Sequence, residues 1–326
     1  MRFVLRRLGH GLILLGVLSL VTFLLAELAP GDPLSALRLD PSISEETLER
    51  LREKYDLDRP WYERYGRWLR SVGQGEFGYS TQYETSVAPL LAPRLRNTLL
   101  LMTAASALAW LLALPLGLLA ARRPDGFWDR VVRLASAALL ATPEILLALG
   151  ALVLAAWSGL FPVGGMQEFS GSSKVFSGLR NLLWHLALPT LVLGLGLLPV
   201  LLLHVTSVVR QVLEEPFLLT ARSLGIPPSR QLLFHALPAA AQPLIALFGL
   251  TLAGLVSGSL LVEVVLGWPG LGPLLLGAVF ARDLHVVLAA GLVSGMFLLL
   301  GNLISDLLSA AVDPRWAANQ HRGQLA

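Results

Sequence analysis

Few side chains in this chain of 326 residues stand in the patterns that catalysis needs. The sequence holds no cysteine, which excludes disulfides, thiol catalysis and thiolate metal sites. Its serines, histidines and aspartates show no spacing that argues for a nucleophile–base–acid triad. The phosphate-binding pattern Gly-x-x-x-x-Gly-Lys-Ser/Thr does not occur, so the chain does not bind ATP by that route. We therefore expect no enzyme activity, no metal site and no cofactor bound by this chain.

Ionisable side chains inside apolar stretches are the main chemical signal. Glu144 interrupts the apolar run of residues 134–158, and Glu263 ends the run of residues 236–262. A charged group in hydrocarbon costs about 2.5–3.5 kcal/mol even on insertion scales, so it faces protein or water and not lipid. We expect both glutamates to line a water-filled path through the protein, where a charged Glu144 would balance a cationic group. A protonated Glu144 that hydrogen-bonds a neighbouring helix or a partner subunit is the alternative.

The depth of Glu144 follows from helix geometry. If residues 134–158 form one helix that enters the membrane near Leu134, Glu144 lies ten residues along it. At about 1.5 Å per residue this places the carboxylate roughly 15 Å deep, near the middle of a core about 30 Å thick. Pro143 frees a backbone carbonyl and is expected to bend the helix. His185 and His204 lie near opposite ends of another run, so we expect them to form hydrogen bonds and not to bind metal.

The elements that must position these residues are membrane helices. The chain is 55% hydrophobic and only 14% charged, which is typical of membrane proteins and not of soluble domains of this size. Because about 20 apolar residues span a bilayer, the apolar runs predict an all-α integral membrane protein with six transmembrane helices. The predicted spans are residues 8–26, 98–121, 134–158, 184–209, 236–262 and 284–305. The first run is too long for a typical signal peptide.

The polar stretches divide the chain. Residues 1–29 are an N-terminal tail with the first transmembrane helix, and residues 30–97 form an extracytoplasmic helical subdomain between the first and second spans. Ser42 and Glu45 form a capping box that predicts a helix start in this subdomain. Residues 98–312 form a five-helix membrane core with a cytoplasmic loop at residues 210–238, and residues 313–326 are a cytoplasmic tail.

The basic residues predict the orientation. Arginines gather at the N-terminus, in the loops after the second and fourth spans and in the C-terminal tail, whereas the short loops on the opposite side hold only Lys174, Arg180 and Arg282. Basic residues favour the cytoplasmic side of short loops. Both termini and the 210–238 loop are therefore expected in the cytoplasm.

The 210–238 loop has its own predicted structure. Residues 217–224 read as a short helix that Gly225 ends, because glycine adopts the left-handed conformation of a helix C-terminus without steric cost. Pro227 and Pro228 are expected to prevent an immediate restart, and Ser229 to cap the helix that returns to the membrane. Such a compact projection suits docking into a pocket of a soluble partner.

This loop resembles the cytoplasmic coupling loop of bacterial ABC-importer permeases, in the form found in the dipeptide and oligopeptide branch. The family pattern is Glu-Ala-Ala, three residues, Gly, nine residues, Ile, one residue and Leu-Pro. Leu219 stands here for the Glu and His235 for the Ile. The resemblance implies contacts with an ATPase from Thr220, Ala221, Arg222, Ser223, Leu224, Gly225, Arg230, Leu237 and Pro238.

Further segments resemble the same branch in the expected order. The stretch from Val262 to Gly272 is similar to its Glu-x-x-Phe-x-x-Pro-Gly-Leu-Gly signature, with Trp268 expected at the membrane interface. A re-entrant turn without a substrate role explains the same glycines. The other matching stretches are residues 28–33, 185–190, 302–308 and 313–315.

The resemblance implies a permease subunit of an ATP-driven importer for di- and oligopeptides in the bacterial cytoplasmic membrane. Its implied partners are a homologous permease subunit, two ABC ATPase subunits that hydrolyse the ATP, an extracytoplasmic substrate-binding protein, the peptide substrate and the lipid bilayer, with no nucleic acid. A nickel-chelate importer is the alternative within the branch. An ion-coupled secondary transporter is a further alternative, although the chain shows no clear internal repeat. A membrane-embedded hydrolase would need the nucleophile–base pairing that the sequence lacks.

Overall fold

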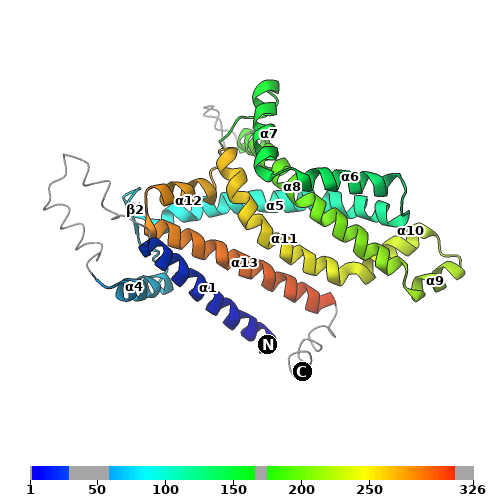
Figure 1. Cartoon of the computed structure of the whole chain (residues 1–326), viewed down its shortest axis with the longest axis horizontal. Helices are drawn as coiled ribbons and strands as arrows, with labels where there is room; N and C mark the ends of the chain where they lie inside the picture. The colour runs from blue at the N-terminus through cyan, green and yellow to red at the C-terminus, as the bar shows by residue number, and fades with distance from the viewer. Residues whose placement is uncertain (1, 29–58, 166–174, 313–326) are drawn as a thin grey trace.

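The structure is a computed structural model that describes residues 2–28, 59–165 and 175–312 (Figure 1). Almost all described segments are helical, as the apolar runs predict. The elements in chain order are α1 (Arg2–Leu28), α4 (Trp61–Gly73), β1 (Tyr79–Ser80), β2 (Thr85–Ser86), α5 (Val87–Arg122), α6 (Phe127–Ala141), α7 (Glu144–Ser158), α8 (Val175–Leu213), α9 (Pro216–Ser223), α10 (Pro228–Arg230), a π-helical turn (Gln231–Ala236), α11 (Leu237–Val265), α12 (Leu271–Phe280) and α13 (Leu284–Val312).

Within the described ranges, four helices are long and apolar enough to cross a membrane: Val87–Arg122, Gly178–Leu213, Pro228–Val265 and Leu284–Ser309. A fifth crossing results if the bent pair α6 and α7 counts as one. The first predicted span corresponds to α1, whose Gly9–Leu25 stretch is a shorter apolar helix. The chain is thus a multi-pass membrane protein.

The third predicted span is not one helix, which corrects the prediction for residues 134–158. α6 ends at Ala141, α7 begins at Glu144, and the two helices meet at an angle of 95°. Pro143 is the N-cap residue of α7 and has no N–H to continue the ladder of α6. The carbonyl of Leu139 instead accepts a hydrogen bond from the backbone N–H of Thr142 at 3.2 Å. The depth calculated for Glu144 along one straight helix is therefore wrong.

The long helices pack closely where glycine faces a neighbouring side chain. A Cβ at Gly117 of α5 would lie 2.6 Å from Cγ1 of Val205 in α8, so only glycine fits there. Gly249 of α11 leaves the same kind of space for Ser305 of α13. Small residues at such crossings are the usual means of close approach between membrane helices. The two glycines therefore allow α5 to pack closely on α8, and α11 on α13.

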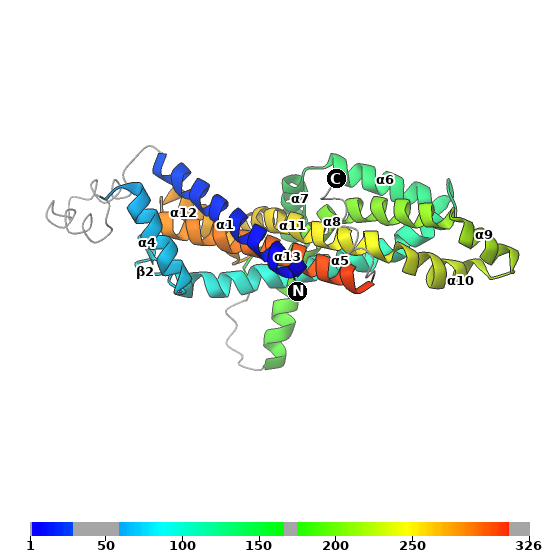
Figure 2. The same ribbon diagram turned by 90° about the horizontal axis from the view of Figure 1, so that it is seen from below.

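The two ends of the bundle differ. One end carries α4, the β1–β2 hairpin and α12, and the other carries α9 and α10 (Figures 1 and 2). The start of α1 and the end of α13 point toward the α9 end. Asp283, in the turn before α13, accepts hydrogen bonds from the hydroxyl of Ser80 and the N–H of Gln82, and so holds the hairpin on the bundle.

The segment between α1 and α5 is described only from residue 59 onward, so the predicted capping box of Ser42 and Glu45 lies outside the described residues. The described part of this segment consists of α4 and the β1–β2 hairpin. The two strands were not predicted from the sequence. Trp68 is buried in a cluster with Phe23 of α1 and Leu288 of α13. α4 therefore packs against two helices of the bundle, and α5 begins eleven residues before the predicted second span, at Val87.

Candidate functional site

The 210–238 loop forms a compact helical unit at the far end of the bundle (Figure 1). Two residues separate the end of α8 from α9, which begins with Pro216 at its first position. α9 ends as predicted at Gly225, whose φ is +73°. The N–H of Gly225 donates to the carbonyl of Arg222 at 3.0 Å, and the N–H of Ile226 donates to that of Ala221 at 3.2 Å. These two bonds form a Schellman motif, the usual glycine-based end of a helix.

The return of the chain differs from the prediction. α10 begins at Pro228 with Pro227 as its N-cap residue, so Ser229 lies inside the helix and does not cap it. The prediction was wrong because proline fits the first helical position, where the missing N–H has no partner to lose. Gln231 is buried, and its Nε2 donates to the carbonyl of Ile226 at 2.6 Å. This bond ties the start of the returning helix to the turn after α9.

The residues predicted to contact an ATPase fall into two groups. Ala221 is buried in the loop's own small core, together with Leu218 and Ala236. Leu224 is 75% exposed, and Gly225 and Arg230 are also exposed. Large apolar side chains that were not predicted join this exposed group; they are Phe217, Leu219, Leu233 and Phe234. Thr220, Arg222 and Ser223 are exposed as well. The unit thus has a packed interior and an outer surface that combines large apolar side chains with arginines, which is typical of an interaction site.

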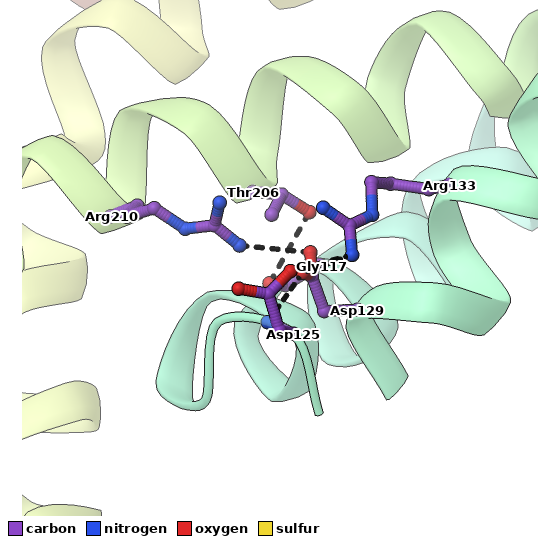
Figure 3. A network of polar contacts seen from close by, with 6 residues as sticks. All are labelled: Gly117, Asp125, Asp129, Arg133, Thr206 and Arg210. Atoms are coloured by element: carbon purple, nitrogen blue, oxygen red, sulfur yellow. Dashed lines mark hydrogen bonds and ion pairs between the residues drawn. The ribbon is translucent and has the colours of Figure 1, made fainter. Parts of the chain in front are cut away.

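A network of charged residues lies beside the start of this loop (Figure 3). Asp129, in the first turn of α6, is only 2% exposed. Its Oδ1 accepts a hydrogen bond from Nη2 of Arg210 in α8 at 2.8 Å. Its Oδ2 accepts from the backbone N–H of Asp125 at 2.9 Å and lies 3.2 Å from Nη2 of Arg133. Both carboxylate oxygens therefore have donors, and the donors come from the α5–α6 turn, α6 and α8.

Sequence reasoning missed this network. The arginines were used only to predict orientation, and Asp129 was not singled out. The one available signal was the spacing of Asp125, Asp129 and Arg133, because residues four apart share a face of a helix. Arg210 is 81 positions away from Asp129 in the sequence, and nothing local connects the two.

Glu144 lies at the first position of α7, directly after the bend. Its carboxylate rests against two glycines of other helices: a Cβ at Gly258 of α11 would lie 3.0 Å from its Oε1, and one at Gly196 of α8 would lie 3.4 Å from the same atom. The side chain is partly exposed. No described residue donates a hydrogen bond or an ion pair to it. Glu144 is thus placed between three membrane helices without a partner in the described chain.

Glu263 has a different environment. It is fully buried, and its Oε2 accepts a hydrogen bond from the N–H of Gly272 at 2.7 Å. Gly267 ends α11 as predicted, with φ at +65°. Trp268 is completely buried and its Nε1 donates to the carbonyl of Asn97 at 3.1 Å, so the prediction of an interfacial tryptophan was wrong. Glu263 and Trp268 therefore hold the turn between α11 and α12 against α5.

The two histidines form backbone hydrogen bonds. Nδ1 of His185 lies 2.9 Å from the carbonyl of Asn181, and Nδ1 of His204 lies 2.9 Å from that of Val200. Among the described residues, no three His, Asp or Glu side chains are grouped so that they could hold a metal ion.

Comparison with known proteins identifies the family. Residues 113–318 match the binding-protein-dependent transport system inner membrane component, and residues 1–102 match the N-terminal part of such membrane components. The chain belongs to this family. The chain is 37% identical to the oligopeptide transport system permease protein AppB of Bacillus subtilis, over 93% of its own length and 95% of the relative.

Other relatives align with a similar share of this chain. The probable D,D-dipeptide transport system permease protein DdpB of Escherichia coli is 32% identical, over 94% of each chain. The oligopeptide transport system permease protein OppB of Mycobacterium tuberculosis is also 32% identical, over 96% of this chain and 98% of the relative. The family consists of transport components and not of a known class of enzymes, and it works with a binding protein.

Proposed function

We propose that this chain is a permease subunit of an ATP-driven importer for di- and oligopeptides. Relatives at 32–37% identity over more than nine-tenths of the chain are permeases of oligopeptide and dipeptide transport systems, which supports this substrate class. The permease forms half of a translocation path with a homologous permease subunit. An extracytoplasmic binding protein delivers the peptide, and two ABC ATPase subunits hydrolyse the ATP.

The observation that carries the coupling role is the helical unit of the 210–238 loop. Its interior is fixed by the Schellman motif and by Gln231, and its surface presents Leu224 and Phe217 to a partner. A unit held in this way moves as one piece. Displacement by an ATPase is therefore transmitted to the two long helices that it joins, α8 and α11. The buried position of Ala221 gives it a role in packing the unit, while the exposed residues make the contacts.

The proposed topology places both termini and this loop in the cytoplasm. α1 is the first of six spans. An even number of spans places both termini on one side of the membrane, and the start of α1 and the end of α13 both point toward the α9 end, which supports this count (Figure 1). The α4–hairpin end then faces the outside. Because the native chain has no cysteine, single cysteines report the orientation directly: one in place of Glu76 reacts with an impermeant thiol reagent from outside, and one in place of Pro124 only from inside. The reverse pattern contradicts the topology and the coupling role.

Glu144 is proposed to line the translocation path. A carboxylate that lies between membrane helices and has no donor among the described residues faces water or a charged ligand, because an unpaired charge in lipid is costly. The ammonium group of a peptide is the ligand that fits this charge. Glu263 was predicted to share this role, and its complete burial under the α11–α12 turn requires that turn to move before a substrate reaches it.

The coupling role is tested with Leu224→Asp in the complex purified with its partner subunits. An aspartate in place of an exposed leucine puts a charge into an apolar contact, so stimulation of ATP hydrolysis by the loaded binding protein should be lost. Leu224→Met keeps the apolar surface and should restore it. Wild-type stimulation in the aspartate variant excludes Leu224 from the contact, and a wild-type complex that takes up peptides without ATP contradicts the importer itself.

A further inference from the structure

The Asp129 network ties the coupling loop to the bent helix pair. Arg210 lies in the last turn of α8, three residues before its end at Leu213, and α9 begins at Pro216. Its partner Asp129 belongs to α6, which leads through the 95° bend to Glu144. Any displacement of α9 therefore acts on the Asp129–Arg210 pair before it reaches the rest of α8.

Arg210 contacts Asp129 through one nitrogen only. Nη2 donates to Oδ1, whereas Nε of Arg210 is buried and has no hydrogen-bond partner among the described residues. A bidentate pair would use both carboxylate oxygens, but Oδ2 already accepts from the N–H of Asp125 and faces Arg133. Asp129 thus keeps two donors when Arg210 leaves, because those donors come from its own helix and the preceding turn (Figure 3).

A second acceptor for Arg210 lies in the same cavity. The cavity has a volume of about 310 Å³, and its lining includes Asp129, Arg210, Gln211 and Glu214. Glu214 lies in the turn directly after α8, where its backbone N–H donates to the carbonyl of Gln211 at 3.2 Å, and its side chain lines the same cavity as Arg210. Its side chain is exposed and forms no ion pair with any residue that the structure describes. The space and the unused carboxylate allow Arg210 to change partners without leaving a buried charge uncompensated.

Resting on the proposed importer function, we propose that Asp129 is a positioning residue of the transport cycle, and that Arg210 exchanges between Asp129 and Glu214 when the coupling loop moves. With Arg210 on Asp129, α6 and the start of the loop move together. With Arg210 on Glu214, the end of α8 is released from α6, and the bend at Pro143 is free to change its angle. The pair is thus an element with two charge-compensated arrangements, which is what a conformational switch requires.

The decisive variant is Glu214→Gln. Glutamine keeps the size of this exposed side chain, which pairs with no described residue. If the network only holds the helices together, the variant should therefore transport as the wild type does. Partner exchange predicts that transport and the stimulated ATPase rate fall by about fivefold or more, in the range of ordinary coupling effects. Arg130→Gln is the control, because Arg130 is an exposed charge next to Asp129 that does not line the cavity.

The complementary variant is Asp129→Asn, measured in the same purified complex with a labelled mixture of alanine peptides of two to five residues. It removes the negative charge that holds Arg210 and keeps the size of the side chain, so ATP hydrolysis should continue while its stimulation by the loaded binding protein and the peptides transported per ATP both fall. If Asp129→Asn does not assemble, Glu214→Gln alone decides. Wild-type transport in Glu214→Gln overturns the exchange, provided that the wild-type complex transports peptides with ATP; if it does not, the importer function has failed instead.

Discussion

The two helices of the bent pair, α6 and α7, each carry a carboxylate in the first helical turn, and the two carboxylates have opposite environments. Asp129 of α6 is 2% exposed and has donors on both oxygens, from Arg210, Arg133 and the N–H of Asp125. Glu144 of α7 has no donor from the described residues and rests against Gly196 and Gly258. A carboxylate with all its donors inside the chain holds helices together, whereas one without them needs water, a proton or a ligand.

Asp129→Ala should have the largest effect on stability. It removes the buried carboxylate that ties α6 to Arg210 of α8 and that accepts from the N–H of Asp125. Loss of one member of a buried pair typically costs 3–5 kcal/mol, and because both arginines are partly exposed we expect about 3 kcal/mol. A large decrease in the Tm of the purified complex checks this. An unchanged Tm would mean that Asp129 does not hold α6 on α8.

Gly258→Leu should have the next largest effect, because it fills the space against which Glu144 lies. A Cβ at Gly258 already approaches Oε1 of Glu144 to 3.0 Å and Cδ1 of Leu193 to 3.3 Å. Overpacking of this kind costs about 1–3 kcal/mol. The control is Gly254→Leu, one turn away on α11, where no described atom lies within 4 Å of the new Cβ. Equal losses of Tm in the two variants would show that the space beside Glu144 is not special.

Arg133→Ala should lower the Tm much less than Asp129→Ala. About half of the Arg133 side chain is exposed, and Asp129 keeps Arg210 and the N–H of Asp125. Surface ion pairs contribute little because water and salt screen them. A decrease as large as that of Asp129→Ala would show that Arg133, and not Arg210, is the main partner of the carboxylate.

Glu144→Gln should have the smallest effect on stability, within about 0.5 kcal/mol, because no described residue donates to the carboxylate. Its effect should instead fall on transport. Glutamine keeps the size but removes the charge, so uptake of free alanine peptides should decrease while uptake of the N-acetylated peptides, which lack the ammonium group, should not. If both kinds of peptide are transported as by the wild type, the charge of Glu144 has no role.

The sequence predicts those parts of the site that depend on neighbouring residues. The end of α9 at Gly225 and the end of α11 at Gly267 follow from single glycines, and the approximate bounds of α5, α8, α11 and α13 follow from the apolar runs. The bend at Pro143 was expected, but its 95° was not, because the angle depends on packing against α8 and α11.

The contacts between distant segments could not be predicted. The Asp129–Arg210 pair joins residues 81 positions apart, and the buried Trp268 reaches a carbonyl 171 positions earlier in the chain. A periodic pattern shows that a face is apolar but not which helix covers it. Ala221 illustrates the same limit, because the family pattern identifies the residue without showing that it points into the loop's own core.

The Schellman motif at Gly225 has a consequence for the thermodynamics of subunit association. Because its hydrogen bonds and the bond from Gln231 lie within residues 221–231, the docking surface is ordered before a partner arrives. Association then carries little entropic cost for ordering the loop. The heat-capacity change of association should therefore correspond to the apolar area that the two surfaces cover, without the additional contribution that accompanies coupled folding and binding.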